Sequence, residues 1–116
     1  MASYFVYVVS CEGGSLYTGI TTDVARRLKE HLSGKAPGAR YTRVRPPEGL
    51  AAVWQTEGRV AASRLEYRIK HLSAAQKRTL VASPQTVADV AGLEPEDRYT
   101  PLAPQDLEAL WRQASD

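Results

Sequence analysis

Three side chains stand out as groups that could handle a phosphate: Arg27, His31 and Glu66. Arg27 and His31 lie four residues apart in a segment whose apolar residues recur with helical spacing. At about 100° per residue, both fall at one edge of the apolar face, whereas Arg26 falls in solvent. An arginine at such an edge can bind a phosphate through two parallel hydrogen bonds. The alternative is an arginine whose stem packs on the helix and whose charge stays in water.

Glu66 is the only acidic residue between Gly58 and Ala88, in a stretch that carries six Lys and Arg residues. On its predicted helix it lies at the boundary between the apolar face and solvent. A single carboxylate in basic surroundings suits one hard divalent cation beside a bound phosphate. The alternative is an ion pair with Lys70 within the helix, worth about 0.3–0.5 kcal/mol. From the residues alone, the ion pair is the simpler interpretation.

Four of the six tyrosines lie in the first 41 residues, at Tyr4, Tyr7, Tyr17 and Tyr41. Tyrosines on strands usually pack against their neighbours. A phenol beside a metal ion and an arginine can instead have a lowered pKa and act as a base. Nothing in the sequence indicates such a lowering.

The elements that must position these groups follow from the hydrophobic pattern. Strands are predicted at residues 4–10, 16–20 and 50–55, with a glycine turn between the first two. Helices are predicted at residues 24–32, 60–72, 74–82 and 104–113, with connections at residues 35–38 and 40–45. The predicted fold is α+β: a small three-stranded antiparallel sheet flanked by helices in the order β-β-α-β-α-α, with a C-terminal helical tail.

Composition and charge fit one soluble globular domain, with 43% hydrophobic and 24% charged residues. Residues 26–80 carry thirteen Lys and Arg against four acids, whereas residues 81–116 carry two Arg against seven acids. The basic middle suggests a surface for a polyanion, and the alternative is a solubilising surface whose halves neutralise each other. We divide the chain into a module at residues 1–83 and an acidic extension at residues 84–116.

Two further observations bear on the compartment. The apolar runs are shorter than the roughly 18 residues that a membrane span needs, so no membrane role is expected. The single cysteine, Cys11, excludes an intramolecular disulfide, which fits the cytoplasm.

The order and spacing of these residues resemble the GIY-YIG nuclease superfamily, and in particular its small stand-alone bacterial members. The two half-motifs are Phe5-Val6-Tyr7 and Tyr17-Thr18-Gly19. The following helix carries Arg27 and His31 in the family's R-x-x-x-H pattern. Arg64-Leu65-Glu66 matches the family's helix with the metal-ligand glutamate, and Ala39-Arg40-Tyr41-Thr42-Arg43 looks like its connector. The resemblance covers residues 4 to about 83.

This resemblance implies an endonuclease that hydrolyses phosphodiester bonds with a single Mg²⁺ or Mn²⁺. Glu66 would hold the ion, and Arg27 would neutralise charge that grows on the transition state. Tyr7 would deprotonate or orient the attacking water, with Tyr17 close by. His31 would assist at the phosphate or orient the tyrosine.

The resemblance also implies where nucleic acid binds. Gly19 would leave room for the phosphate at the corner between strand and helix. Arg40, Tyr41 and Arg43 would contact the substrate by charge and by stacking. The expected substrate is DNA in preference to RNA, branched or single-stranded, with weak sequence preference. The alternative is a nucleic-acid-binding module with little or no turnover, which acts through a protein partner, and the acidic tail is a candidate surface for such a partner.

Overall fold

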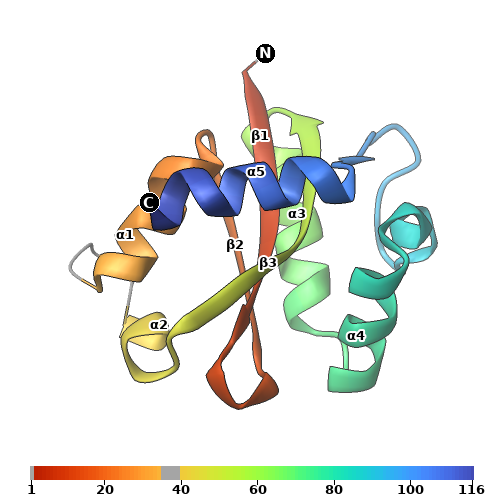
Figure 1. Ribbon diagram of the computed structural model, residues 1–116. Helices are drawn as coiled ribbons and strands as arrows, with labels where there is room; N and C mark the ends of the chain where they lie inside the picture. The colour runs from red at the N-terminus through yellow and green to blue at the C-terminus, as the bar shows by residue number, and fades with distance from the viewer. Residues whose placement is uncertain (1, 35–39) are drawn as a thin grey trace.

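The computed structural model describes residues 2–34 and 40–116 (Figure 1). The predicted connection at residues 35–38 therefore lies outside the described residues, as does Ala39. The strands are β1 (Ser3–Cys11), β2 (Leu16–Thr21), β3 (Pro47–Glu57) and β4 (Thr100–Pro101). The helices are α1 (Val24–Ser33), α2 (Arg40–Val44), α3 (Arg59–Lys70), α4 (Ala74–Ala82) and α5 (Pro104–Ser115), with short 3-10 helices η1 (Glu12–Gly14) and η2 (Pro84–Asp89).

The strands form one antiparallel sheet in the order β2-β1-β3-β4, so β1 is central and β2 is a free edge. Successive side chains of a strand point to opposite faces. Val6 and Val8 of β1 lie on one face with Trp54 of β3, whereas Tyr7 lies on the other face with Val53. Because both faces are covered, β1 reads in the sequence as a continuous apolar run.

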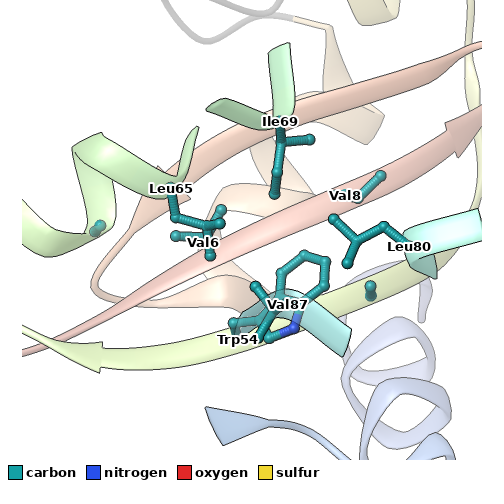
Figure 2. Close-up of a cluster of buried hydrophobic side chains, with 9 residues drawn as sticks. Val6, Val8, Trp54, Leu65, Ile69, Leu80 and Val87 are labelled. Atoms are coloured by element: carbon teal, nitrogen blue, oxygen red, sulfur yellow. The ribbon is translucent and has the colours of Figure 1, made fainter. Parts of the chain in front are cut away.

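A helical layer covers each face of the sheet. Leu65 and Ile69 of α3, with Leu80 of α4 and Val87 of η2, pack on the first face (Figure 2). On the other face α1 and α5 pack together; α5 crosses one side of the sheet while α3 lies behind it (Figure 1). The residues that carry candidate chemistry thus lie on helices from both layers.

The predicted α+β class is confirmed, but the predicted three-stranded sheet is wrong, because β4 adds a fourth strand. This strand has two residues, of which Thr100 pairs with Gln55 and Pro101 pairs with Trp54. It is too short to show an alternating pattern, and its proline is typical of an edge position, so no strand could be predicted there. The segment 40–45, predicted as a connection, contains the short helix α2.

Local capping sets the two ends of α1, the helix that carries Arg27 and His31. The side chain of Asp23 accepts a hydrogen bond from the backbone N–H of Arg26 at the start of the helix. At the end, Gly34 adopts φ 69° and its N–H donates to the last carbonyls of the helix. The helix was predicted from the sequence, as was the greater burial of Arg27 relative to Arg26, and both are observed. His31, predicted at the edge of the apolar face, is instead fully buried, because it packs between Tyr7 and Thr42.

The acidic extension packs on the same core as the rest of the chain. The indole N–H of Trp54 donates to the Pro84 carbonyl at 2.9 Å, and the Tyr99 hydroxyl donates to the Ala61 carbonyl at 2.8 Å. Leu110 and Trp111 of α5 pack against the face that contains Tyr7. The division at residue 83 stays a prediction. Within the described parts of the chain, none of the helices combines the length and apolar character that crossing a membrane requires.

Candidate active site

Tyr7 lies at the centre of the candidate site, on β1, and is 1% exposed. It pairs across the sheet with Gly19 of β2. A Cβ atom on residue 19 would lie 2.4 Å from the Tyr7 hydroxyl oxygen, which is far inside van der Waals contact. Gly19 therefore makes room for the phenol, and its predicted role beside a phosphate stays a prediction.

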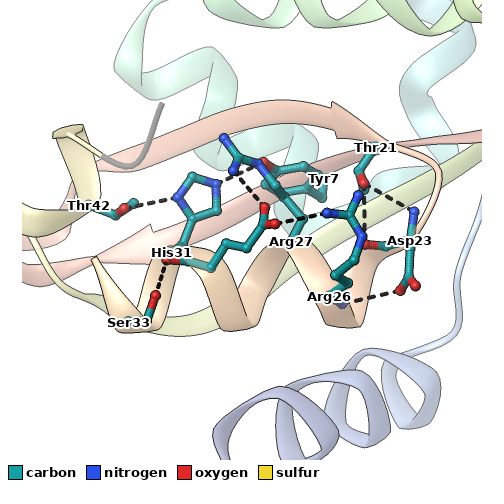
Figure 3. A network of polar contacts seen from close by, with 9 residues as sticks. Tyr7, Thr21, Asp23, Arg26, Arg27, His31, Ser33 and Thr42 are labelled. Atoms are coloured by element: carbon teal, nitrogen blue, oxygen red, sulfur yellow. Dashed lines mark hydrogen bonds and ion pairs between the residues drawn. The ribbon is translucent and has the colours of Figure 1, made fainter. Parts of the chain in front are cut away.

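A chain of hydrogen bonds joins three elements at Tyr7 (Figure 3). The hydroxyl oxygen of Tyr7 lies 2.9 Å from Nε2 of His31 on α1. On the other side of the ring, Nδ1 of His31 lies 2.9 Å from Oγ1 of Thr42 on α2. His31 and Thr42 are 1% and 2% exposed, so both bonds are shielded from water. Of the two roles expected for His31, this contact supports the one that orients the tyrosine.

The surroundings set the protonation of both rings. Burial raises the pKa of Tyr7; the neighbouring Tyr17 and Glu66 act in the same direction, and Arg27 opposes them. Burial, with the charge of Arg27, lowers the pKa of His31 to about 4. At neutral pH the phenol is protonated and the imidazole is neutral, so one ring nitrogen donates and the other accepts. The sequence left open a lowered pKa for a tyrosine, but the residues around Tyr7 raise its pKa instead.

Arg27 reaches Tyr7 from α1. Its side chain is 19% exposed, and its Nη1 donates to Glu30 at 2.8 Å. Its charge and a hydrogen bond to Tyr7 also act on the phenol. Arg26 pairs with the same Glu30 at 2.8 Å, but its side chain is 57% exposed. The two adjacent arginines thus differ as their helical phase predicts.

Glu66 approaches from α3 with its side chain 24% exposed. Its carboxylate lies 3.4 Å from Nζ of Lys70, so the alternative ion pair is present. Its charge also acts on the pKa of Tyr7, as the smallest of the contributions there, and its membership of one site with Tyr7 and Arg27 stays a prediction. Within the described residues no three His, Cys, Asp or Glu side chains form a metal-binding group. A cation here would rest on one carboxylate, as Mg²⁺ does when water and substrate phosphate complete its coordination.

Aromatic rings continue the site from Tyr7 towards α2. The ring of Tyr17 lies 5.1 Å from that of His31 and 5.4 Å from that of Tyr41, between centroids. Tyr41 is 38% exposed, and a surface pocket of about 450 Å³ opens beside it, with Arg40 in its lining. Tyr41, predicted to stack on the substrate, is therefore exposed at the end of a row of aromatic rings, and Arg40 lies beside it.

Two further residues of α2 differ in exposure: Arg43 is exposed and Thr42 is buried. Arg43, predicted as a substrate contact, is exposed and donates through Nη1 to the Gly34 carbonyl at 2.9 Å. Thr42 was not singled out from the sequence, because a five-residue helix is too short to show which side chain it buries.

Comparisons with known proteins identify the family of this chain. Residues 3–79 match the GIY-YIG catalytic domain. A UPF0213 protein of Halalkalibacterium halodurans is 50% identical over 80 residues, covering 69% of this chain and 83% of the relative. A UPF0213 protein of Desulfotalea psychrophila is 54% identical over 79 residues, covering 68% and 71%.

A solved structure is also similar to this chain. It is the solution NMR structure of the UPF0213 protein BH0048 from Bacillus halodurans, with 43% identity and a TM-score of 0.46. The match covers 79% of this chain and 99% of that chain. The domain match and the identity to these relatives lead to one conclusion: the chain belongs to the GIY-YIG family of nuclease domains.

Proposed function

We propose that this protein is a divalent-metal-dependent endonuclease that hydrolyses phosphodiester bonds in DNA. One observation carries the proposal: the buried Tyr7 hydroxyl is held by His31 and influenced by the charges of Arg27 and Glu66. A cationic donor, a carboxylate and a hydrogen-bonded hydroxyl are the groups that phosphodiester hydrolysis needs in one place.

Glu66 is the residue we assign to a single Mg²⁺ or Mn²⁺. Its partial exposure leaves an oxygen accessible, and its partner Lys70 is itself 48% exposed, so the pair can open at small cost. The bound ion would supply Lewis-acid stabilisation of the phosphate and of the leaving oxygen.

Tyr7 and His31 are assigned to the attacking water. A neutral imidazole at 2.9 Å can accept a proton from the tyrosine hydroxyl. Tyr7 can thereby accept a proton from water while it passes its own to His31, without a free phenolate at neutral pH. Thr42 would hold the imidazole in place through the second ring nitrogen. Arg27 would donate hydrogen bonds to the non-bridging phosphate oxygens, whose charge grows in the transition state.

For the substrate, we propose DNA that is single-stranded or branched and is bound with weak sequence preference. Tyr41 offers an exposed ring, and Arg40 and Arg43 offer charge beside it. Stacking and phosphate contacts accept every base, which suits unpaired strands. We place the protein in the cytoplasm, since Cys11 is a free, buried thiol.

A binding module with little turnover is the second candidate. The ion pair between Glu66 and Lys70 favours it, because a lysine in that position competes with a metal ion. A protein partner on the acidic extension belongs to this candidate.

The test is cleavage of end-labelled branched DNA, single-stranded DNA and RNA in Mn²⁺ or Mg²⁺. The parent is compared with Glu66→Gln and Arg27→Ala, and we expect each variant to lose cleavage by about a hundredfold or more. The matched control is Glu108→Gln, because Glu108 pairs with Arg112 four residues later on α5 just as Glu66 pairs with Lys70. Equal cleavage by all four proteins would sink the assignment, and binding without cleavage by the parent would support the second candidate.

A further inference from the structure

A polar pocket of about 300 Å³ opens beside Arg27, where β2 ends at the edge of the sheet. One wall is α1, which contributes Arg26, Arg27 and Glu30. Arg59, the first residue of α3, adds a third guanidinium group to the lining. Thr21 also lines the pocket. The pocket is thus shared by the two helices that carry the candidate catalytic residues.

Its charge suits an oxyanion. Three guanidinium groups line it against the single carboxylate of Glu30, which accepts hydrogen bonds from both Arg26 and Arg27. Arg59 is exposed and forms no ion pair with any residue that the structure describes. Guanidinium groups bind phosphate through paired, charge-assisted hydrogen bonds, so the pocket offers net positive charge and directed donors.

The position of Arg59 relative to Glu66 sets which phosphate it could meet. The two residues are seven positions apart on α3, which is close to two turns, so they share a face of the helix. At about 1.5 Å per residue, they lie roughly 10 Å apart along the axis. Phosphates of one strand recur every ~3.4 Å along a duplex axis. For a strand that runs along α3, the pocket would therefore meet a phosphate about three linkages from the one at Glu66.

We propose that this pocket is a second phosphate subsite, in which Arg59 and Arg26 bind a backbone phosphate that flanks the one being cleaved. The inference rests on the proposed function. It gives the nucleic-acid strand a path from the exposed ring of Tyr41, past Tyr7 and Arg27, to Arg59. The phosphodiester backbone is the ligand, and no base is read there.

The test measures binding of a fluorescent single-stranded DNA by anisotropy in EDTA at several salt concentrations. The proteins are the parent, Arg59→Ala and Arg78→Ala; Arg78 is a matched control, being an exposed arginine on α4. We expect Arg59→Ala to bind about tenfold more weakly, with a salt slope smaller by about 0.7. A series of strands, each with one neutral methylphosphonate linkage, then locates the contact. Neutralising one linkage should weaken the parent about tenfold and leave Arg59→Ala almost unchanged.

Two results would overturn the subsite: equal affinities of Arg59→Ala and Arg78→Ala, or an equal loss in parent and Arg59→Ala at every neutral linkage. Cleavage in Mn²⁺ separates this inference from the proposed function. A parent that binds but does not cleave contradicts the nuclease, while the linkage series still decides for or against the subsite. A parent that does not bind DNA contradicts both.

Discussion

The two helices that carry candidate site residues hold their functional groups differently: α1 packs on the same face of the sheet as Tyr7, whereas α3 packs on the opposite face. On α1, Arg27 is paired with Glu30 of its own helix and hydrogen-bonded to Tyr7 of β1. His31 is bonded to Tyr7 and to Thr42 of α2, so groups on other elements restrain both side chains. On α3, Glu66 is paired with Lys70 of its own helix, across 3.4 Å and in partial contact with water. One half of the site is built into the fold, whereas the other is a surface ion pair.

This difference suits the two tasks that we propose. Groups that stabilise developing charge act best when they are fixed before the reaction, since no reorganisation is then needed. A group that receives a cation must instead give up its present partner, and an exposed pair within a helix holds that partner by only about 0.3–0.5 kcal/mol. We call Tyr7, Arg27 and His31 the fixed half of the site. We expect large effects on stability and activity where this half is disturbed, and small effects on stability at Glu66.

The largest effect is expected at Gly19, where the fixed half has no spare room. Gly19→Ala places a methyl group 2.4 Å from the Tyr7 oxygen, and the hydrogen bond to His31 restrains the ring. We expect a destabilisation of about 1–3 kcal/mol. We also expect a loss of cleavage of about a hundredfold, because the hydroxyl must move. Urea unfolding and cleavage kinetics measure the two effects.

Gly49→Ala on β3 is the control for Gly19→Ala. Its added Cβ would meet Ser10 Oγ at 3.3 Å, a far milder contact in the same sheet. Similar losses in the two variants would show that the close fit above Gly19 has no special importance for the site.

An effect of intermediate size is expected on acidification, which also acts on the fixed half. The pKa of His31 is about 4 in the folded protein, against roughly 6.5 when the residue is exposed to solvent. Between these pH values the folded state binds fewer protons than the unfolded state. Stability that is present above pH 6.5 is therefore lost as the pH falls towards 4, by roughly 2–3 kcal/mol.

The measurement is the free energy of unfolding in urea at pH 7 and at pH 4.5, for the parent and for His31→Gln. The amide of glutamine can replace the hydrogen bond at Nε2 but does not titrate, so this variant should lose much of the acid sensitivity. His71→Gln, at the exposed second histidine, is the control. An unchanged pH profile in His31→Gln would contradict the neutral, buried imidazole.

The smallest effect is expected at the ion pair of α3. Lys70→Ala should change the free energy of unfolding by less than about 0.5 kcal/mol, as for other exposed pairs in helices. Because it frees Glu66, it should lower the Mn²⁺ concentration that gives half-maximal cleavage. Arg112→Ala, which breaks the equivalent pair on α5, is the control. A large loss of stability in Lys70→Ala would show that the ion pair of Glu66 contributes as much to stability as the contacts of Arg27 and His31.

What the sequence could predict depended on whether the cause was local. The cap at Asp23 and the apolar stripe of α1 are local, and they were enough to separate Arg27 from Arg26. The same holds for α4, which begins after the capping box of Ser73 and was predicted with its observed ends. The continuous β-rich run at residues 4–10 and the glycine turn after it predicted β1 and β2. Local pattern could not reveal β4, whose pairing is set by contacts distant in sequence.

The site was less accessible to sequence reasoning, for the same reason. The contact between Thr42 and His31 spans eleven residues and two helices, and no periodicity announces it. The direction of the Tyr7 pKa shift depends on burial, and the strand pattern alone does not give the depth of one ring in the core. The proximity of Glu66 to Tyr7 came from the family resemblance and not from the residues of α3.

The placement of the two tryptophans has a practical, spectroscopic consequence. Trp54 is fully buried on the face covered by α3, whereas Trp111 is partly buried on the face covered by α1 and α5. The chain contains no other tryptophan. Each layer therefore carries its own intrinsic fluorophore, and replacing either one leaves a single reporter. Emission from Trp111 alone would follow the layer that holds Arg27 and His31, and emission from Trp54 alone would follow the layer that holds Glu66.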